Sequence, residues 1–333
     1  MTTLAVPLPH ARQGIALAGA MLGIGILALV LAGWVPVQFS IATVFLFAGP
    51  HNWMEARYIM GRLPARAGRL FPFFAVSFVG VVGLTAAFIL IPNYLQSATS
   101  ALDHATAYAV WNTTFLIWIA TLVQMRAYTN PRFDAGWVWP VCFLLIAGNW
   151  LSPFAFSMAI VYLHPCMAMV ILDRELTKSR PHWRGPYHVL LLAIPLAIAV
   201  LWFRLHDAPP LPGHDPLTTT IGNHAGDWFF TGISNHFLVS LHTFLEMVHY
   251  GIWVLVIPMI GLRSLPWNLS TIPAARRSIG WRHAITVVLL AGLGVVVVLW
   301  ACFLVDYGTT RSIYFLAALL HVLAEVPFLL RMV

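Results

Sequence analysis

The sequence predicts an all-α protein, a polytopic transmembrane helix bundle of about ten spans that forms a single domain over residues 1–333. Of its residues, 60% are hydrophobic and 9% are charged, whereas soluble proteins carry about 25% charged residues. Ten apolar runs approach the roughly 20 residues that a membrane-spanning helix needs. Arginine and lysine gather in alternate loops between these runs. We therefore expect an integral membrane protein, located in the inner membrane of a bacterium.

The ten runs are defined, in chain order, by apolar composition and by the polar residues that end them. They lie at 14–33, 37–58, 71–91, 105–125, 137–152, 155–172, 187–204, 233–258, 284–304 and 312–330. Only Asn149-Trp-Leu-Ser-Pro153 separates the fifth run from the sixth, so the two could be separate helices or one broken helix. Asn112, Gln124 and Asn149 are polar residues inside runs, where amide side chains hold neighbouring helices together.

Positive charge follows the second, fourth, sixth, eighth and tenth runs, and the other loops are poor in it. The residues concerned are Arg57, Arg62, Arg66 and Arg69; Arg126 and Arg132; Arg174, Lys178, Arg180 and Arg184; Arg263, Arg276, Arg277 and Arg282; and Arg331. Cytoplasmic loops carry an excess of arginine and lysine, so both termini are predicted to be cytoplasmic. The net charge of +7 follows this loop distribution and does not indicate nucleic acid as a partner.

Four of the even-numbered runs carry a histidine at a similar depth. His51, His164, His249 and His321 lie six to ten residues before the cytoplasmic end of their runs. At about 1.5 Å per residue, this places them roughly 9–15 Å from the cytoplasmic boundary. Ionisable residues inside a membrane are rare and usually face a functional interior. Their common depth predicts that the four imidazoles share one site.

Glutamate recurs four residues from histidine, a spacing that places both side chains on one face of a helix. The pairs are His51 with Glu55, His242 with Glu246, and His321 with Glu325. Glu246 also precedes His249 by three residues, the spacing by which helix bundles supply ligands to di-iron centres. For Glu55, an interfacial salt bridge with Arg57 or Arg62 is the alternative to a role in the site.

These residue types predict a transition-metal site. We expect His51, His164, His249 and either His242 or His321 to bind the metal, and Glu55, Glu246 and Glu325 to act as ligands or catalytic residues that orient imidazoles. Imidazole and carboxylate without thiolate suit iron, manganese, copper or zinc. Fe(II) is the expected ion, because open sites with several histidines favour non-haem iron when a substrate is oxidised.

Four short segments resemble, in their order, motifs of the Brp/Blh-type membrane β-carotene dioxygenase family. They are Gly49-Pro50-His51-Asn-Trp-Met-Glu55, Tyr162-Leu-His164-Pro-Cys-Met167-Ala168, His242-x3-Glu246-x2-His249 and His321-x3-Glu325. The chain departs from the family at Glu55, where Asp is usual, and in the third segment, which lacks two histidines four residues apart. The resemblance implies an iron-dependent cleavage of a carotenoid by O₂ to retinal-type aldehydes.

The expected function is that of an integral-membrane metalloenzyme, a metal-dependent oxygenase that oxidises or cleaves a hydrophobic small molecule such as a carotenoid. Its expected partners are the lipid bilayer, this substrate and O₂. One alternative is a haem-binding redox subunit, in which histidines on facing helices would be axial ligands. Another is a transporter of protons or metal ions, because chains of glutamate and histidine form relays, although no inverted repeat supports it. The sequence does not indicate an oligomeric state.

Overall fold

The computed structural model describes residues 9–64, 66–95, 101–130, 134–212, 215–261 and 267–332, and all regular structure in them is helical. All ten predicted runs fall on helices. Eight segments are long and apolar enough to cross a membrane: Gly14–Trp34, Gly68–Ile91, Asp103–Thr129, Pro153–Ser179, Pro181–Leu205, Asn235–Ile260, Ile279–Val305 and Tyr307–Met332. These eight candidate spans confirm the prediction of an integral membrane protein. The other two runs form α2 (Pro36–Arg62) and the shorter α5 (Val138–Leu151), and their role as spans stays a prediction.

The chain divides into two compact units, which are described separately below. Unit 1 comprises Met1–Tyr58, Pro165–Thr271 and Val295–Trp300, and unit 2 comprises Ile59–His164, Ile272–Gly294 and Ala301–Val333. Three helices, α2, α6 (Pro153–Ser179) and α12 (Ile279–Val305), contribute residues to both units. The prediction of one domain over residues 1–333 stays a prediction.

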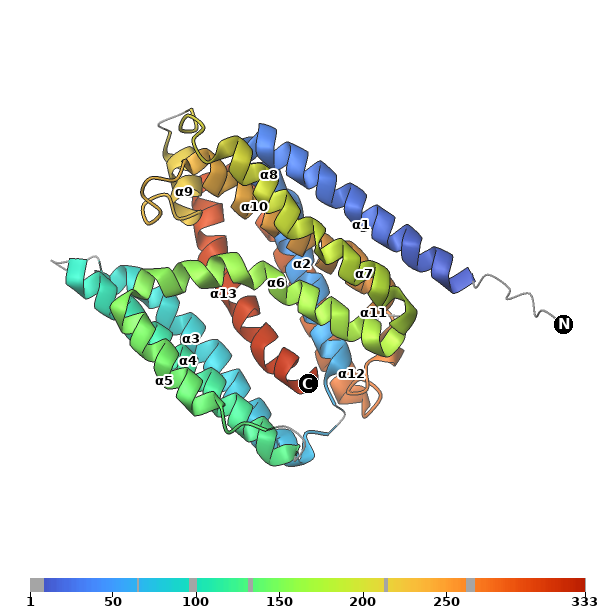
Figure 1. Cartoon of the computed structure of the whole chain (residues 1–333). Helices are drawn as coiled ribbons and strands as arrows, with labels where there is room; N and C mark the ends of the chain where they lie inside the picture. The colour runs from blue at the N-terminus through green and yellow to red at the C-terminus, as the bar shows by residue number, and fades with distance from the viewer. Residues whose placement is uncertain are drawn as a thin grey trace. The chain divides into compact units, whose positions relative to one another are not determined.

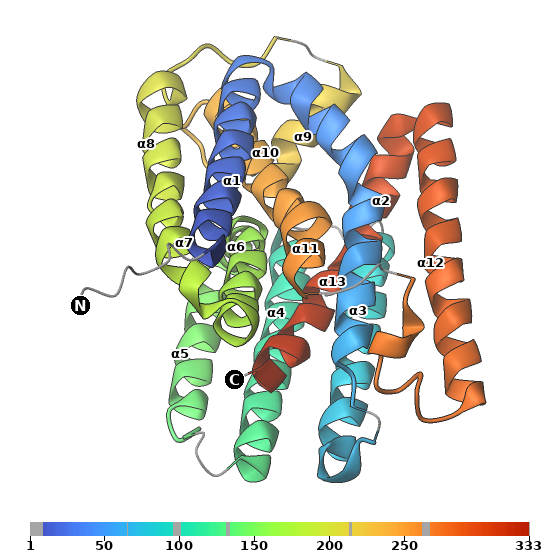
Figure 2. The same cartoon turned by 90° about the vertical axis from the view of Figure 1, so that its right-hand side faces the viewer.

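Helix α10 (Asn235–Gly251) is the inner helix of unit 1. It packs against α1 (Pro9–Trp34) and α8 (Ala193–Leu205), and α1 also packs against α7 (Arg184–Leu191) (Figure 2). Two-thirds of the span Asn235–Ile260 is buried (67%), against 11% of Gly14–Trp34. Polar residues on α10 are therefore inside the protein, whereas most of α1 faces outward with apolar side chains suited to lipid.

A π-helical turn, Ile252–Val256, continues α10 directly and leads into α11 (Ile257–Gly261). Single π turns within α-helices are rare, and they are frequent at functional sites. Trp253 in this turn is fully buried, and its ring meets Tyr58 of α2 edge-on at a centroid distance of 5.6 Å. The turn therefore belongs to the packed interior of unit 1 and begins just after His249 and Tyr250.

The segment before α10 contains a short helix that the sequence analysis did not predict, α9 (Pro216–His224). Asp215 caps its first turn by accepting hydrogen bonds from the amides of Leu217 and Thr218, and side-chain caps of this kind stabilise helix starts. The hydrogen bond from the Thr218 hydroxyl also lowers the pKa of Asp215. This carboxylate therefore stays negatively charged outside the spans.

Unit 2 is built around α3 (Phe71–Leu95), α4 (Ala101–Thr129) and α13 (Tyr307–Met332). Helices α3, α4 and α5 follow one another as neighbours, and α13 packs against both α3 and α4 (Figure 1). Helix α5 ends at Leu151, and α6 starts at Pro153 after Ser152. The fifth and sixth runs are thus two separate helices rather than one.

Buried amides join α4 to α5, as the sequence predicts for Asn112 and Asn149. The Asn112 amide donates to Asn149 Oδ1 at 2.8 Å and to the Pro153 carbonyl at 3.1 Å. Asn149 in turn donates to the Ala109 carbonyl at 2.9 Å. Both side chains are at most 1% exposed. This pair therefore fixes how α4 and α5 pack against each other in a medium that offers few other partners.

Asn149→Ala should destabilise the protein by about 1 kcal/mol, since interhelical hydrogen bonds in membranes are worth roughly that amount. The measurement is the thermal unfolding midpoint of the purified protein in detergent. Thr114→Val is the matched control, because the Thr114 hydroxyl is exposed and bonds only within its own helix, to Val110. Equal midpoints for both variants would contradict a role of the amide pair in holding α4 and α5 together.

Candidate metal centre

His51 lies in the middle of α2, directly after Pro50. A proline inside a helix lacks an N–H and clashes with the carbonyl four residues earlier, so the helix loses a hydrogen bond there. The His51 ring also bonds to this turn of the helix, because its Nδ1 lies 3.0 Å from the Phe47 carbonyl oxygen. A carbonyl can only accept, so Nδ1 carries the proton. The lone pair of the neutral ring is therefore on Nε2, which is the atom left for a metal.

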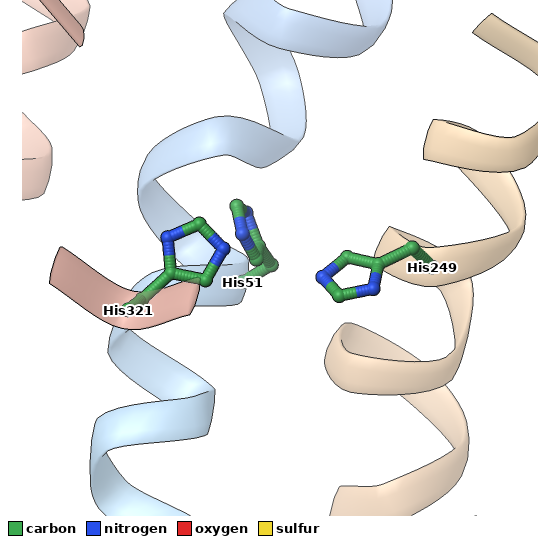
Figure 3. A group of neighbouring side chains, drawn as sticks. All are labelled: His51, His249 and His321. Atoms are coloured by element: carbon green, nitrogen blue, oxygen red, sulfur yellow. The ribbon is translucent and has the colours of Figure 1, made fainter. Parts of the chain in front are cut away.

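His249 of α10 faces His51 within unit 1. The two rings meet edge-on, with centroids 5.5 Å apart and planes at 75°. Each offers a ring nitrogen within 4.8 Å of the other, and the side chains point toward each other in Figure 3. His51 is fully buried and His249 is 2% exposed. Two imidazoles so enclosed and so close can bind one ion between them.

Tyr250 connects this pair to a carboxylate. Its ring stacks on His51 at a centroid distance of 4.2 Å, and its hydroxyl donates to Glu246 Oε1 at 2.8 Å. The sequence analysis missed Tyr250. Its position four residues after Glu246 is the signal that could have found it, because such residues share a helix face. Glu246 is thus linked to the His51 ring through Tyr250.

His242 lies one turn before Glu246, with Nδ1 3.9 Å from Glu246 Oε2. Its ring also meets that of His224, at the end of α9, at a centroid distance of 4.9 Å and nearly at right angles. His224 is not among the site residues that the sequence predicts. Its contact with His242 could not be expected from spacing, since the two belong to different helices.

A second histidine pair lies within unit 2, between α6 and α13. His164 Nε2 and His321 Nε2 are 3.3 Å apart, and Glu325 Oε2 lies 3.2 Å from His164 Nδ1. Metal–nitrogen bonds of about 2.1 Å to both Nε2 atoms would enclose an angle of roughly 105°, close to tetrahedral. The Glu325 carboxylate is fully buried, and a carboxylate behind a ligating imidazole fixes its tautomer and raises its basicity.

The His51–His249 pair of unit 1 consists of two buried imidazoles that could contribute to a metal site (Figure 3). The three free cysteines, Cys142, Cys166 and Cys302, are not part of this pair. The predicted roles of His164, His242 and His321 as ligands stay predictions, as do the catalytic roles of the three glutamates.

Glu55 is 1% exposed, one turn after His51 on α2. Its neighbour Arg57 donates to the Asn268 carbonyl at 3.2 Å and to Thr271 Oγ1 at 3.1 Å. These bonds show that Arg57 connects α2 to the segment after α11 within unit 1. Whether Glu55 forms a salt bridge or belongs to the candidate metal site therefore stays open.

No protein-family model, curated protein or solved structure matches this chain. The resemblance to the Brp/Blh-type family therefore remains a prediction from four short segments.

Glu325→Gln should weaken metal binding by about 10- to 100-fold, the usual cost of removing an outer-shell carboxylate. Glutamine keeps the shape of the side chain but loses the charge that favours a proton on His164 Nδ1. The measurement is the dissociation constant for Zn²⁺ in a competition titration with a coloured chelator. Asp173→Asn is a suitable control, because Asp173 binds Arg184 and His188 instead. Unchanged affinity in Glu325→Gln would exclude an orienting role for this carboxylate.

Proposed function

We propose that this chain is an integral-membrane metalloenzyme that oxidises or cleaves a lipid-soluble substrate. The observation that carries the proposal is the pairing of buried imidazoles within each unit, His51 with His249 in unit 1 and His164 with His321 in unit 2. His164 is a further ligand through its contact with His321, with Glu325 behind it. Glu246 and Glu55 orient or complete the ligand set. Burying several imidazoles in a membrane is costly, and such residues are typically retained for function.

Fe(II) is the ion we propose. Imidazole with carboxylate, without thiolate, is the donor set of non-haem iron sites, and such an ion would supply the activation of O₂. The protein residues hold and orient the imidazoles. The Phe47 carbonyl directs the His51 lone pair to Nε2, and the Tyr250 ring stacks on the His51 ring. The enclosed bundle excludes water from reactive species.

The substrate we propose is a long apolar molecule, of which a carotenoid is the example that the family resemblance implies. An apolar groove in unit 1 supports a ligand of this class. It has a volume of about 270 Å³ and lies among α1, α7, α8 and α10. Phe244 and Val248 of α10 and Ile252 of the following π turn line it at intervals of four residues. The rim includes lipid-exposed side chains such as Ile26 and Leu196.

A haem-binding redox subunit is the second candidate. Two axial nitrogens on opposite sides of one iron would be about 4 Å apart, if each bond is about 2 Å as in other imidazole complexes. His164 Nε2 and His321 Nε2, at 3.3 Å, suit neighbouring positions on one ion better. An absorption spectrum of the purified protein separates the candidates, because haem has an intense Soret band and a histidine–carboxylate iron site does not.

His51→Ala, His249→Ala and His321→Ala should each reduce bound metal to a small fraction of the wild-type content, because a methyl group cannot replace an imidazole ligand. The measurement is elemental analysis of protein purified without added metal. His188→Ala is the control, since this histidine is half-exposed and bound to Asp173. Full metal content in all three variants would reject the shared site.

Expression in a β-carotene-producing bacterium should bleach the colour and generate retinal, and the loss should require oxygen. His249→Ala should restore the colour if the protein still inserts into the membrane. The measurement is extraction of the pigments and their separation by chromatography. Persistent colour with well-inserted, metal-loaded wild-type protein would reject carotene as the substrate, and it would leave the metal site to be tested with other membrane lipids.

A further inference from the structure

We propose that His224, His242 and Glu246 form a loading path by which a divalent metal ion reaches the His51–His249 pair from the membrane face that carries residues 205–230. The path rests on the proposed metal centre and extends it with a residue, His224, that the centre itself does not use. It lies entirely within unit 1, between the end of α9 and the last turns of α10.

The donors form a continuous line. The ring of His224 meets that of His242 at a centroid distance of 4.9 Å. His242 Nδ1 is 3.9 Å from Glu246 Oε2, and Glu246 precedes His249 by three residues on the same helix. Each neighbouring pair in this line consists of two groups that can ligate a transition metal. An ion that moves from one pair to the next would therefore always have a ligating group beside it.

The step between His242 and Glu246 has the right size for a bridging ion. Bonds of about 2.0–2.2 Å to an imidazole nitrogen and a carboxylate oxygen together span up to roughly 4.2 Å, and the two atoms are 3.9 Å apart. The same separation is too long for a direct hydrogen bond, which needs about 3.2 Å or less. The spacing therefore suits an ion held between the two side chains better than a bond between them.

Burial increases along the line. His224 is half-buried, His242 is 8% exposed and Glu246 is 6% exposed. His249 is 2% exposed, and His51 is fully buried. His224, at the end of α9, is thus the most accessible donor and would be the first to bind an ion from water. The deepest donors, His249 and His51, are the proposed ligands.

The negative charge of the sequence around α9 favours the binding of a cation at the His224 end of the path. No lysine or arginine occurs between Arg204 and Arg263, whereas Asp207, Asp215 and Asp227 lie within this stretch. Asp227 is three residues after His224, and Asp215 caps the helix that ends at His224. A region that carries charge of one sign raises the local concentration of ions of the opposite sign. The carboxylates of Asp215 and Asp227, which have no lysine or arginine within ten residues in the sequence, would therefore attract a divalent cation to the start of the line.

The test follows the uptake of Co²⁺ by metal-depleted, full-length protein in detergent, observed through visible absorption in a stopped-flow instrument. His224→Ala should slow loading by about tenfold, the lower end of the effect of an outer-shell ligand on a metal site. Its final Co²⁺ content and spectrum should equal those of the wild type. His206→Ala is the matched control, because His206 lies in the same acidic segment but binds Asp207, and it should load at the wild-type rate.

His242→Gln keeps a polar side chain of similar reach, and it tests the second step if His224→Ala does not fold. It should also slow loading while the final Co²⁺ content stays complete. A lower final content would instead make His242 a permanent ligand and overturn its place in the path. In oriented vesicles, Co²⁺ should load only from the face that carries residues 205–230, and loading from the other face alone would overturn the direction.

The outcomes separate the path from the centre. If the wild type takes up Co²⁺ and His224→Ala does so at the same rate, the path is wrong and the centre stands. If the wild type takes up no Co²⁺, the proposed metal centre is wrong, and the path falls with it.

Discussion

The acceptor that a buried imidazole needs for its ring N–H is the constraint that sets the orientation of His51 and His164. A buried polar group without a partner costs about 1–3 kcal/mol, and a membrane interior offers no water to replace one. His51 uses the Phe47 carbonyl, and His164 has the Glu325 carboxylate beside it. Once Nδ1 is occupied in this way, Nε2 is the atom that faces inward. The helices thus supply both the imidazoles and the groups that orient them.

Most of the fold could be predicted from the sequence, because the length of an apolar run is set by the thickness of a membrane. Every predicted run is helical, and the amides of Asn112 and Asn149 do join two helices. Two features were not predicted. Helix α9 is too short and polar to show as a run, although Asp215-Pro216 is a favourable cap and first residue for a helix. The π turn at Ile252–Val256 has no local sequence pattern from which it could be predicted.

The histidines that lie inside the protein could be predicted because ionisable residues are conspicuous in apolar runs, but their partners could not. Spacing placed Glu325 on the face of His321, whereas its carboxylate contacts His164 on another helix. Glu246 does lie near His242, yet its hydrogen bond is to Tyr250. Helical periodicity states which side chains share a face. It does not state which neighbouring helix that face meets, and this decides which side chain becomes the partner.

The π turn after His249 has a consequence for how related chains should be compared. A π turn holds one residue more than the α-helix it interrupts, and one residue rotates a helix by roughly 100°. A relative that lacks one residue within Ile252–Val256 would therefore keep His249 in place and restore an unbroken α-helix. Alignments through this span should allow a single-residue gap there, because a gap placed before His249 would misalign the histidines themselves.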